Sequence, residues 1–519
     1  MRTEARAAGV FPSGPPPMLR RSGIAAPLMP QPVHVPHLWR GGSPPAPPQR
    51  PAPLWPWLAA ASLTALALLV FTARFYWRSE PPRFAVLPFA TGADPSLHQV
   101  RSELLNELIH QIGSRPPGRL LVTGRDSSMQ FAAREPSARQ VRDVLRADYV
   151  LLGKLRRDGS RLEAVARLID ARRNVQIRSW TVHADLAQTS FDRDIASQLS
   201  GKVFELLYPD ASHRADLSDQ CRGCWEPLRN ARTLQAKGTE EGYQRSASLF
   251  EEASRIEQRC DRAWSGMAES LVALARRNGD EALLERARRA AQEALRRNPL
   301  NAEAMQALAN VHLWRDWDWR EAERLLRRSL EASPSAATAH QDMAWFLVTS
   351  GRRAEAVASV RRAIALDPLS APINAGAAWI YLQAHEFEES ARQARRALEL
   401  EPGLREAQSC LALALLYQGK HAEAWAAMRP LAPPGFREPR NPTDAIVLLF
   451  RQFVATRTRN PYARAVRLAW LGETDAALEA IEEAVRARRP SAVMLRSEPA
   501  FVGLWGSPRF RTLMEKAGR

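Results

Sequence analysis

Hydrophobic residues follow two different patterns along this chain. In residues 83–208, short apolar runs typical of buried strands alternate with amphipathic stretches of helical period. In residues 226–519, apolar residues recur at spacings of three and four, which places them on one face of successive helices. The pattern predicts an α+β domain followed by a long helical region.

The first region predicts the element order β-α-β-α-β-β-β-α. RFAVLPFA and RLLVTGRDSS have the composition of strands, the second followed by a turn, whereas LLNELIHQIG and ARQVRDVLRA are amphipathic. Three more strands are expected over residues 147–182, with turns at Asp158-Gly159 and at 172–174. A helix over Ile195–Leu207 completes the predicted domain.

The helical region repeats with a period of 34 or 35 residues. Each period closes on a similar phrase that ends in proline, at Pro299, Pro334, Pro368 and Pro402. Within one period, Gly351 suits the left-handed turn that ends a helix, and Pro368 cannot continue the next helix. A period of about 34 is that of the tetratricopeptide repeat (TPR). The chain resembles this family, which implies an α-solenoid (TPR superhelix) of stacked helix pairs.

The repeats are expected to occupy residues 226–519. The first repeat is irregular, and one period contains an extra residue near Trp317. The tail has two short phrases that end in Phe501 and Phe510. Because the last repeat of a solenoid would otherwise expose its apolar face, we expect this tail to act as a cap.

Residues 83–208 also resemble the TolB amino-terminal-like domain. The phrases VLPF, VTGRDSS, ADYVLLGKLRRDGSRL and FDRDIASQL carry the resemblance. In bacterial proteins this domain often links a membrane helix to a TPR array. In many relatives a winged-helix domain, a nucleotide cyclase or a protein kinase precedes the membrane helix. Here proline-rich residues 1–53 hold that place, so we expect no such output domain.

Residues 1–53 are rich in Pro, Gly, Ser and Arg and have no apolar period. They predict a disordered tail that is either a tether or a proline-rich ligand. The segment that follows contains 20 residues without a charge and has aromatic residues at both ends, which predicts one uncleaved transmembrane helix over residues 54–76. Arginines in the tail favour a cytoplasmic N-terminus and periplasmic C-terminal domains, in a single-pass protein of the bacterial inner membrane.

Charge and motifs narrow the functional classes. The net charge is +17, but only five lysines are present and no basic block stands out, so nucleic acid is not expected as a partner. The sequence has no phosphate loop, no G-x-S-x-G elbow and no H-E-x-x-H motif. We therefore predict no catalytic residue, no cofactor, no metal and no enzymatic activity.

Two cysteines, Cys221 and Cys224, lie in the predicted linker over residues 209–225. A zinc site would need a second pair or nearby histidines, and a thioredoxin-type motif would follow a strand rather than precede helices. Three interpretations remain: a local disulfide between these two residues, free thiols, or metal or redox chemistry. A periplasmic location favours the disulfide.

The predicted binding surface is the concave face that the first helices of the repeats line. One position recurs there at the repeat spacing, and Trp345 and Trp379 are expected to stack in neighbouring repeats. Aromatic side chains in a groove suit an extended peptide or helix, and packing against adjacent helices is the equal alternative. The candidate residues are Asn310, Trp345, Trp379, Leu413, Gln306 and Gln341.

These features predict a membrane-anchored TPR scaffold or sensor that binds a partner protein segment, in signalling or in envelope assembly. Two alternatives stay open. One is a regulator that acts on transcription or a kinase through a partner bound by the N-terminal tail. The other is a redox protein that uses Cys221 and Cys224.

Overall fold

The computed structural model describes residues 81–92, 94–114, 120–132, 136–188, 190–208, 221, 223–236, 238–456 and 460–518. The chain divides into two units, 1–79 and 80–519, and all of the described residues lie in the second. The predicted tail and transmembrane segment, residues 1–53 and 54–76, lie outside the described residues. Within the described part, no helix has both the length and the apolar character that a membrane crossing requires.

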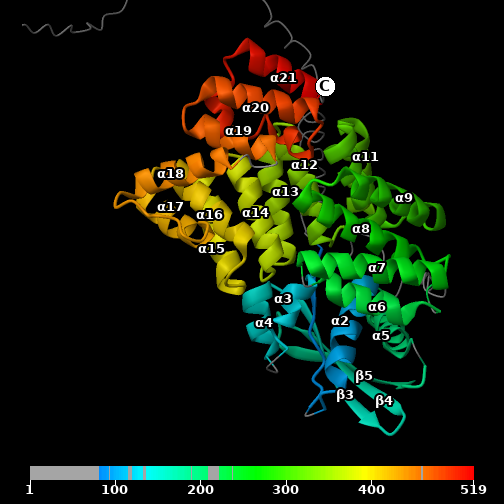
Figure 1. Cartoon of the computed structure of the whole chain (residues 1–519). Helices are drawn as coiled ribbons and strands as arrows, with labels where there is room; N and C mark the ends of the chain where they lie inside the picture. The colour runs from blue at the N-terminus through cyan, green and yellow to red at the C-terminus, as the bar shows by residue number, and fades with distance from the viewer. Residues whose placement is uncertain are drawn as a thin grey trace, which may run out of the picture. The chain divides into compact units, whose positions relative to one another are not determined.

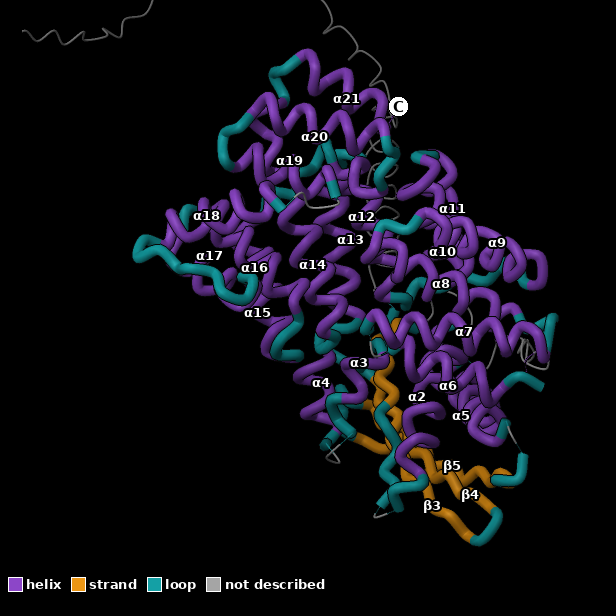
Figure 2. Tube along the Cα trace, viewed as in Figure 1, coloured by secondary structure: helices purple, strands orange, loops and turns teal. Residues whose placement is uncertain are grey.

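A five-stranded sheet forms the first part of the described chain (Figures 1 and 2). The strand order is β2-β1-β3-β4-β5, in which β1 pairs in parallel with β2 and β3, and the last three strands form an antiparallel meander. The strands are β1 (Arg83–Val86), β2 (Leu121–Val122), β3 (Tyr149–Asp158), β4 (Arg161–Asp170) and β5 (Val175–Asp185).

Helices cover both faces of this sheet because its buried strands alternate their side chains between two apolar layers. Phe84 and Val86 of β1 pack with α2 and α5, whereas Ala85 packs with α4. The element order agrees with the prediction, apart from an additional short helix, α3, where a turn was expected. The helices of this region are α2 (Leu97–Gly113), α3 (Arg125–Met129), α4 (Ala138–Leu145) and α5 (Phe191–Leu207).

Antiparallel helix pairs follow, joined by short turns. The pairs are α6 (Trp225–Gln235) and α7 (Glu240–Ile256), α8 (Asp261–Asn278) and α9 (Glu281–Arg297), α10 (Ala302–Val311) and α11 (Trp319–Ala332), α12 (Ala337–Thr349) and α13 (Arg353–Leu366), α14 (Ala371–Gln383) and α15 (Phe387–Leu400), α16 (Arg405–Tyr417) and α17 (His421–Met428). After η3 (Arg429–Leu431) and α18 (Pro442–Ala455), one more pair follows, α19 (Pro461–Trp470) and α20 (Thr474–Arg486). The chain then continues with η4 (Pro490–Met494), η5 (Pro499–Leu504) and α21 (Pro508–Gly518).

The extra residue near Trp317 has a structural counterpart. The first helix of that repeat ends in a π-helical turn, η2 (His312–Asp316), which accommodates one more residue than an α-helical turn. Trp317 then takes the left-handed conformation, with φ of 58°, at the position where Gly351 and Gly419 stand in later repeats. The insertion therefore widens one turn without shifting the register of the repeats.

The first helices of the repeats form the inner layer of the array. Successive first helices, from α8 through α10, α12 and α14 to α16, pack against one another, whereas contacts between successive second helices are much sparser. An ion pair of 3.3 Å between Arg277 Nη2 of α8 and Glu406 Oε1 of α16 joins helices that are four repeats apart. The array therefore curves so that its first helices face inward.

The sheet region docks on the loops between repeats. The backbone N–H of Ser127 donates to Asp367 Oδ1 at 2.8 Å, and the N–H of Val122 donates to Ser335 Oγ at 3.1 Å. Gly124 must lack a side chain at this junction, since a Cβ atom there would lie 2.2 Å from Asp367 Cγ. Burial, together with the nearby Asp126 carboxylate, raises the pKa of Asp367 to about 7.

Candidate functional site on the inner face of the array

The predicted groove residues lie on the first helices, but several of them are buried. Asn310 and Trp345 are 6% and 8% exposed, and Gln306 is buried as well. Gln341 is partly buried, and its Nε2 donates to the carbonyl oxygen of Ile373. Trp379 and Leu413 are partly exposed. Asn310, Gln306 and Trp345 are therefore packed in the array, as the alternative interpretation expects. Binding of a partner by the six candidate residues stays a prediction.

The expected stacking of Trp345 on Trp379 is wrong. Among the described residues, Trp345 instead meets Trp314 of the preceding repeat edge-on, with ring centroids 6.2 Å apart. The Arg276 guanidinium of α8 lies over both rings, 5.2 Å from the Trp314 centroid and 5.7 Å from that of Trp345. A cation between two aromatic faces is favourable because the ring faces are negative, so Arg276 stabilises the pair of Trp314 and Trp345.

Polar contacts hold this aromatic group in place. Trp314 Nε1 donates to Asn310 Oδ1 at 3.0 Å, and Asn310 Nδ2 donates to Asp342 Oδ2 at the same distance. Asp342 Oδ1 is 3.8 Å from Arg276 Nη1. Burial raises the pKa of Asp342, while Arg276 and Asn310 favour its ionised form. Asn310 and Trp345 thus form part of a connected polar and aromatic layer.

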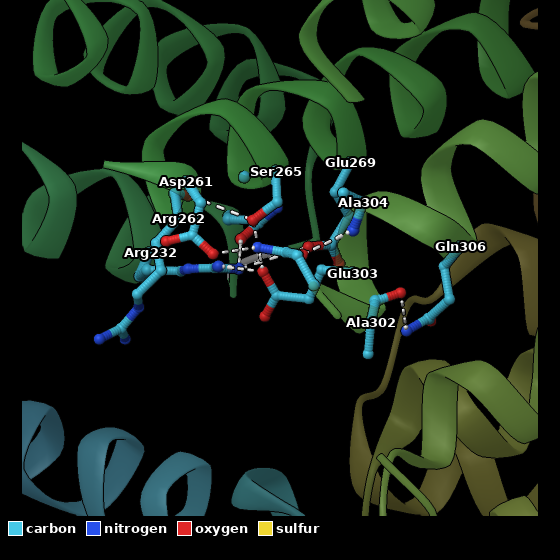
Figure 3. A network of polar contacts seen from close by, with 12 residues as sticks. Arg232, Asp261, Arg262, Ser265, Glu269, Ala302, Glu303, Ala304 and Gln306 are labelled. Atoms are coloured by element: carbon cyan, nitrogen blue, oxygen red, sulfur yellow. Dashed lines mark hydrogen bonds and ion pairs between the residues drawn. The ribbon is translucent and has the colours of Figure 1, made fainter. Parts of the chain in front are cut away.

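A second group of charges lies nearer the start of the array (Figure 3). Arg232 of α6 binds Glu303 of α10 and lies 3.3 Å from Glu269 Oε2 of α8. Ser265 Oγ also donates to Glu303 Oε2 at 2.9 Å. Glu269 nevertheless keeps 43% of its side-chain surface exposed. Together with Arg277 and Glu406, these side chains form the inner-face charge row.

Glu269 and Glu303 of this row ionise differently. Burial raises the pKa of Glu269, and the neighbouring Glu303 raises it further. Burial has the same effect on Glu303, but Arg232 overcomes it and holds the pKa of that carboxyl below its usual range. Because Arg232 approaches Glu303 more closely than Glu269, it favours the ionised form of Glu303 more strongly. Two neighbouring carboxyl groups whose pKa values differ in this way occur in acid–base catalysis. Here the same pair also suits the binding of cationic and amide groups.

Buried ion pairs join the sheet region to the first repeats. Arg262 Nη2 of α8 lies 2.9 Å from Glu107 Oε2 of α2. Arg229 Nη1 of α6 lies 3.0 Å from Glu103 Oε2 of the same helix α2. Burial raises the pKa of Glu103 to about 7, against the opposing effect of Arg229. These pairs fix α6 and α8 against α2 and so set the start of the inner face.

Of the three interpretations of Cys221 and Cys224, the local disulfide between them is wrong. Cys221 bonds instead to Cys260, which precedes α8 in the chain. The turn between α7 and α8 brings Cys260 to the start of α6, a contact between residues 39 positions apart that local spacing does not reveal. Cys224 is a buried free thiol, and burial raises its pKa to about 11.

Comparison with known proteins supports the repeat. Residues 312–371 match the tetratricopeptide repeat family. The chain therefore contains a TPR-like helical solenoid, with a small sheet region on its N-terminal side. No curated protein sequence matches this chain.

Several solved structures are similar in fold. A thermophilic TPR protein of Thermus thermophilus has 24% identity, with 37% of this chain and 99% of that chain covered, at a TM-score of 0.32. YrrB, described as a TPR protein with an unusual peptide-binding site, has 18% identity over 37% of this chain and 90% of its own, at a TM-score of 0.24. The human IFIT1 dimer with m7Gppp-AAAA has 15% identity over 64% of this chain and 76% of its own, at a TM-score of 0.37. The likeness concerns the repeat fold alone.

Sequence reasoning missed both Arg276 and the inner-face charge row, although part of their signal was present. The recurring position of the predicted groove, which Asn310, Trp345, Trp379 and Leu413 occupy, is Arg276 one period earlier. Glu269 and Glu303 are related by the same spacing. Arg232 could not be found in this way, because the irregular first repeat gives no register for α6.

Proposed function

We propose that this protein is a scaffold without enzymatic activity, which binds an extended segment of a partner protein along the inner face of its helical array. The observation that carries the proposal is the inner-face charge row, whose Glu269 and Glu406 side chains are 43% and 53% exposed. These carboxylates line a curved surface, and each also has an arginine beside it, Arg232 or Arg277.

The chemistry of this surface suits a polar peptide. Carboxylates and guanidinium groups on a curved surface can pair with side chains of both signs and with peptide N–H and C=O groups. Farther along the array, the partly exposed Trp379 and Leu413 offer apolar contact. We therefore expect a segment with basic residues opposite Glu269 and Glu406 and with apolar residues opposite Trp379.

Selection of peptides from a displayed library on the full-length chain tests this function. We expect the selected peptides to lose at least tenfold in affinity for the Glu269→Ala/Glu406→Ala double variant, because both changes remove exposed acceptors of the inner face. Fluorescence anisotropy with a labelled peptide measures this loss.

The matched control is Glu399→Ala on the second helix α15. Glu399 is 63% exposed and, like Glu406, pairs with an arginine, here Arg396 at 2.8 Å. The control should bind as the wild type does. Equal affinity of the wild type and the double variant, or loss of binding in Glu399→Ala, would refute the inner face as the binding surface.

Location is the second part of the proposal. The uncharged run within residues 54–76 and the resemblance of residues 83–208 to the TolB amino-terminal-like domain support a single-pass anchor in the bacterial inner membrane. The disulfide between Cys221 and Cys260 suits an oxidising compartment such as the periplasm, where the scaffold would serve signalling or envelope assembly. We expect alkaline phosphatase fused after Arg519 to be active in bacterial cells. An inactive phosphatase fusion, together with fluorescence of green fluorescent protein fused at the same position, would place the array in the cytoplasm.

A further inference from the structure

Three cysteines meet in the core where the linker enters the array. Cys221, Cys224 and Cys260 are at most 2% exposed, and their three Sγ atoms all lie within 4.8 Å of one another. A disulfide uses only Cys221 and Cys260, which leaves Cys224 beside the bond. Its thiol donates to the carbonyl oxygen of Cys221 at 3.6 Å. A simple structural crosslink does not need this third sulfur.

We propose that, when the disulfide is reduced, Cys221, Cys224 and Cys260 bind one zinc ion through three thiolates. Thiolate sulfur is the preferred protein ligand of zinc, and three protein ligands leave a fourth, tetrahedral position for water. The two states exclude each other, because the disulfide and the metal use the same Sγ atoms of Cys221 and Cys260.

Burial and the Glu257 carboxylate raise the pKa of Cys224, but other groups at the cluster favour the negative charge that such a site would carry. Three thiolates and Zn²⁺ leave a net charge of −1. Cys224 is the N-cap of α6 and Cys260 is the N-cap of α8, so the positive ends of two helix dipoles lie at the cluster. The guanidinium groups of Arg193 and Arg262 lie 5.7 Å and 5.4 Å from the ring centroid of Trp225, the residue next to Cys224.

The exchange between the two states balances with a thiol reductant. Two molecules of a small monothiol supply two electrons and two protons to the bond between Cys221 and Cys260, and they leave as their own disulfide. Zn²⁺ then displaces the three thiol protons of the cluster as it binds. Either state joins the start of α6 to the start of α8, so the array keeps a crosslink at this point in oxidising and in reducing surroundings.

Titration of the full-length protein with Co²⁺, a spectroscopic substitute for zinc, tests the proposal. The protein is first reduced with a phosphine, which is then removed without oxygen. We expect one Co²⁺ per chain, with thiolate-to-cobalt charge-transfer absorption that disappears when Zn²⁺ is added. The Cys224→Ser variant should lose at least tenfold in affinity, and its absorption should fall by about a third because two thiolates remain.

Two controls make the result decisive. Cys410 is also a buried free thiol but lies in α16, so Cys410→Ser should bind cobalt as the wild type does. The oxidised wild type should bind none. Oxidised Cys224→Ser keeps the Cys221–Cys260 disulfide, and its helical circular dichroism shows whether the variant folds. Absence of the charge-transfer band in reduced protein, or an unchanged band in Cys224→Ser, would overturn the zinc site and leave a structural disulfide beside an inert thiol.

Discussion

Replacement of Arg262 by methionine is expected to lower the free energy of unfolding by about 3 kcal/mol at pH 7. Arg262 Nη1 and Nη2 both donate to the Glu107 carboxylate, at 3.3 Å and 2.9 Å, and Gln111 donates to it at 2.8 Å. The Glu107 side chain is only 3% exposed. Without the guanidinium, a buried carboxylate would keep one amide donor, and removal of one partner of a buried pair costs more than the pair itself contributes.

The pH dependence of the same variant follows from the pKa of Glu107. Burial would raise this pKa, but Arg262 overcomes the effect and holds it at about 2. Because the folded-state pKa is below the unfolded one, the pair stabilises the wild type fully above about pH 4.5, and this stability is lost as the pH falls toward 2. In Arg262→Met the sign reverses, so protonation of Glu107 should make the variant more stable at pH 5 than at pH 7. Urea unfolding at both pH values measures the difference.

Two further variants separate the buried pair from a general effect of losing an arginine. Arg262→Met/Glu107→Met should recover most of the loss, since no buried charge then remains. Arg396→Met removes a pair with Glu399 whose side chains are 43% and 63% exposed, and it should cost less than about 1 kcal/mol. If Arg262→Met were as stable as Arg396→Met, the junction between the sheet region and the array would not depend on this ion pair.

The Phe501→Ala variant is expected to lose about 3 to 4 kcal/mol from the C-terminal part of the array. Phe501 is fully buried in η5, where its ring meets Tyr462 of α19 edge-on at 5.7 Å and Phe510 of α21 at 5.8 Å. Its truncation leaves a cavity between the last helix pair and the tail. Since Phe501 shares one hydrophobic core with α19, α20 and α21, hydrogen exchange should accelerate first in these helices.

Val502 provides the control for the cap. It is the next residue in the same 3-10 helix and is 46% exposed, so Val502→Ala should change the exchange of these helices little. Similar acceleration in both variants, or acceleration that starts in α8 and α10, would contradict a cap built on Phe501.

The sequence predicted the repeats well because their signal is local and recurs. Proline after each second helix, glycine at the turn and small residues at the helix crossings act within one period. The same reasoning placed the strands, since the β3–β4 turn at Asp158-Gly159 and the alternating burial of β4 are local patterns too. Phe501 and Phe510, which the sequence marked in the tail, are both buried in the last core.

Contacts between distant segments could not be predicted in this way. The bond between Cys221 and Cys260 depends on how α7 returns along α6, and the ion pair of Arg277 with Glu406 depends on the curvature of several repeats. The aromatic partner of Trp345 also depends on three-dimensional packing, so the stacking predicted with Trp379 was wrong. The π-helical turn of η2 brings Trp314 to Trp345, and Arg276 of α8 lies over both rings.

Photo-cross-linking of a selected peptide shows directly whether a partner binds on the inner face. Benzoylphenylalanine is placed in one protein at the position of Glu406 and in another at the position of Glu399, two exposed sites that lie on a first helix and on a second helix. Binding on the inner face predicts a peptide cross-link from the position of Glu406 and none from that of Glu399. A cross-link from the position of Glu399, with none from that of Glu406, would contradict it.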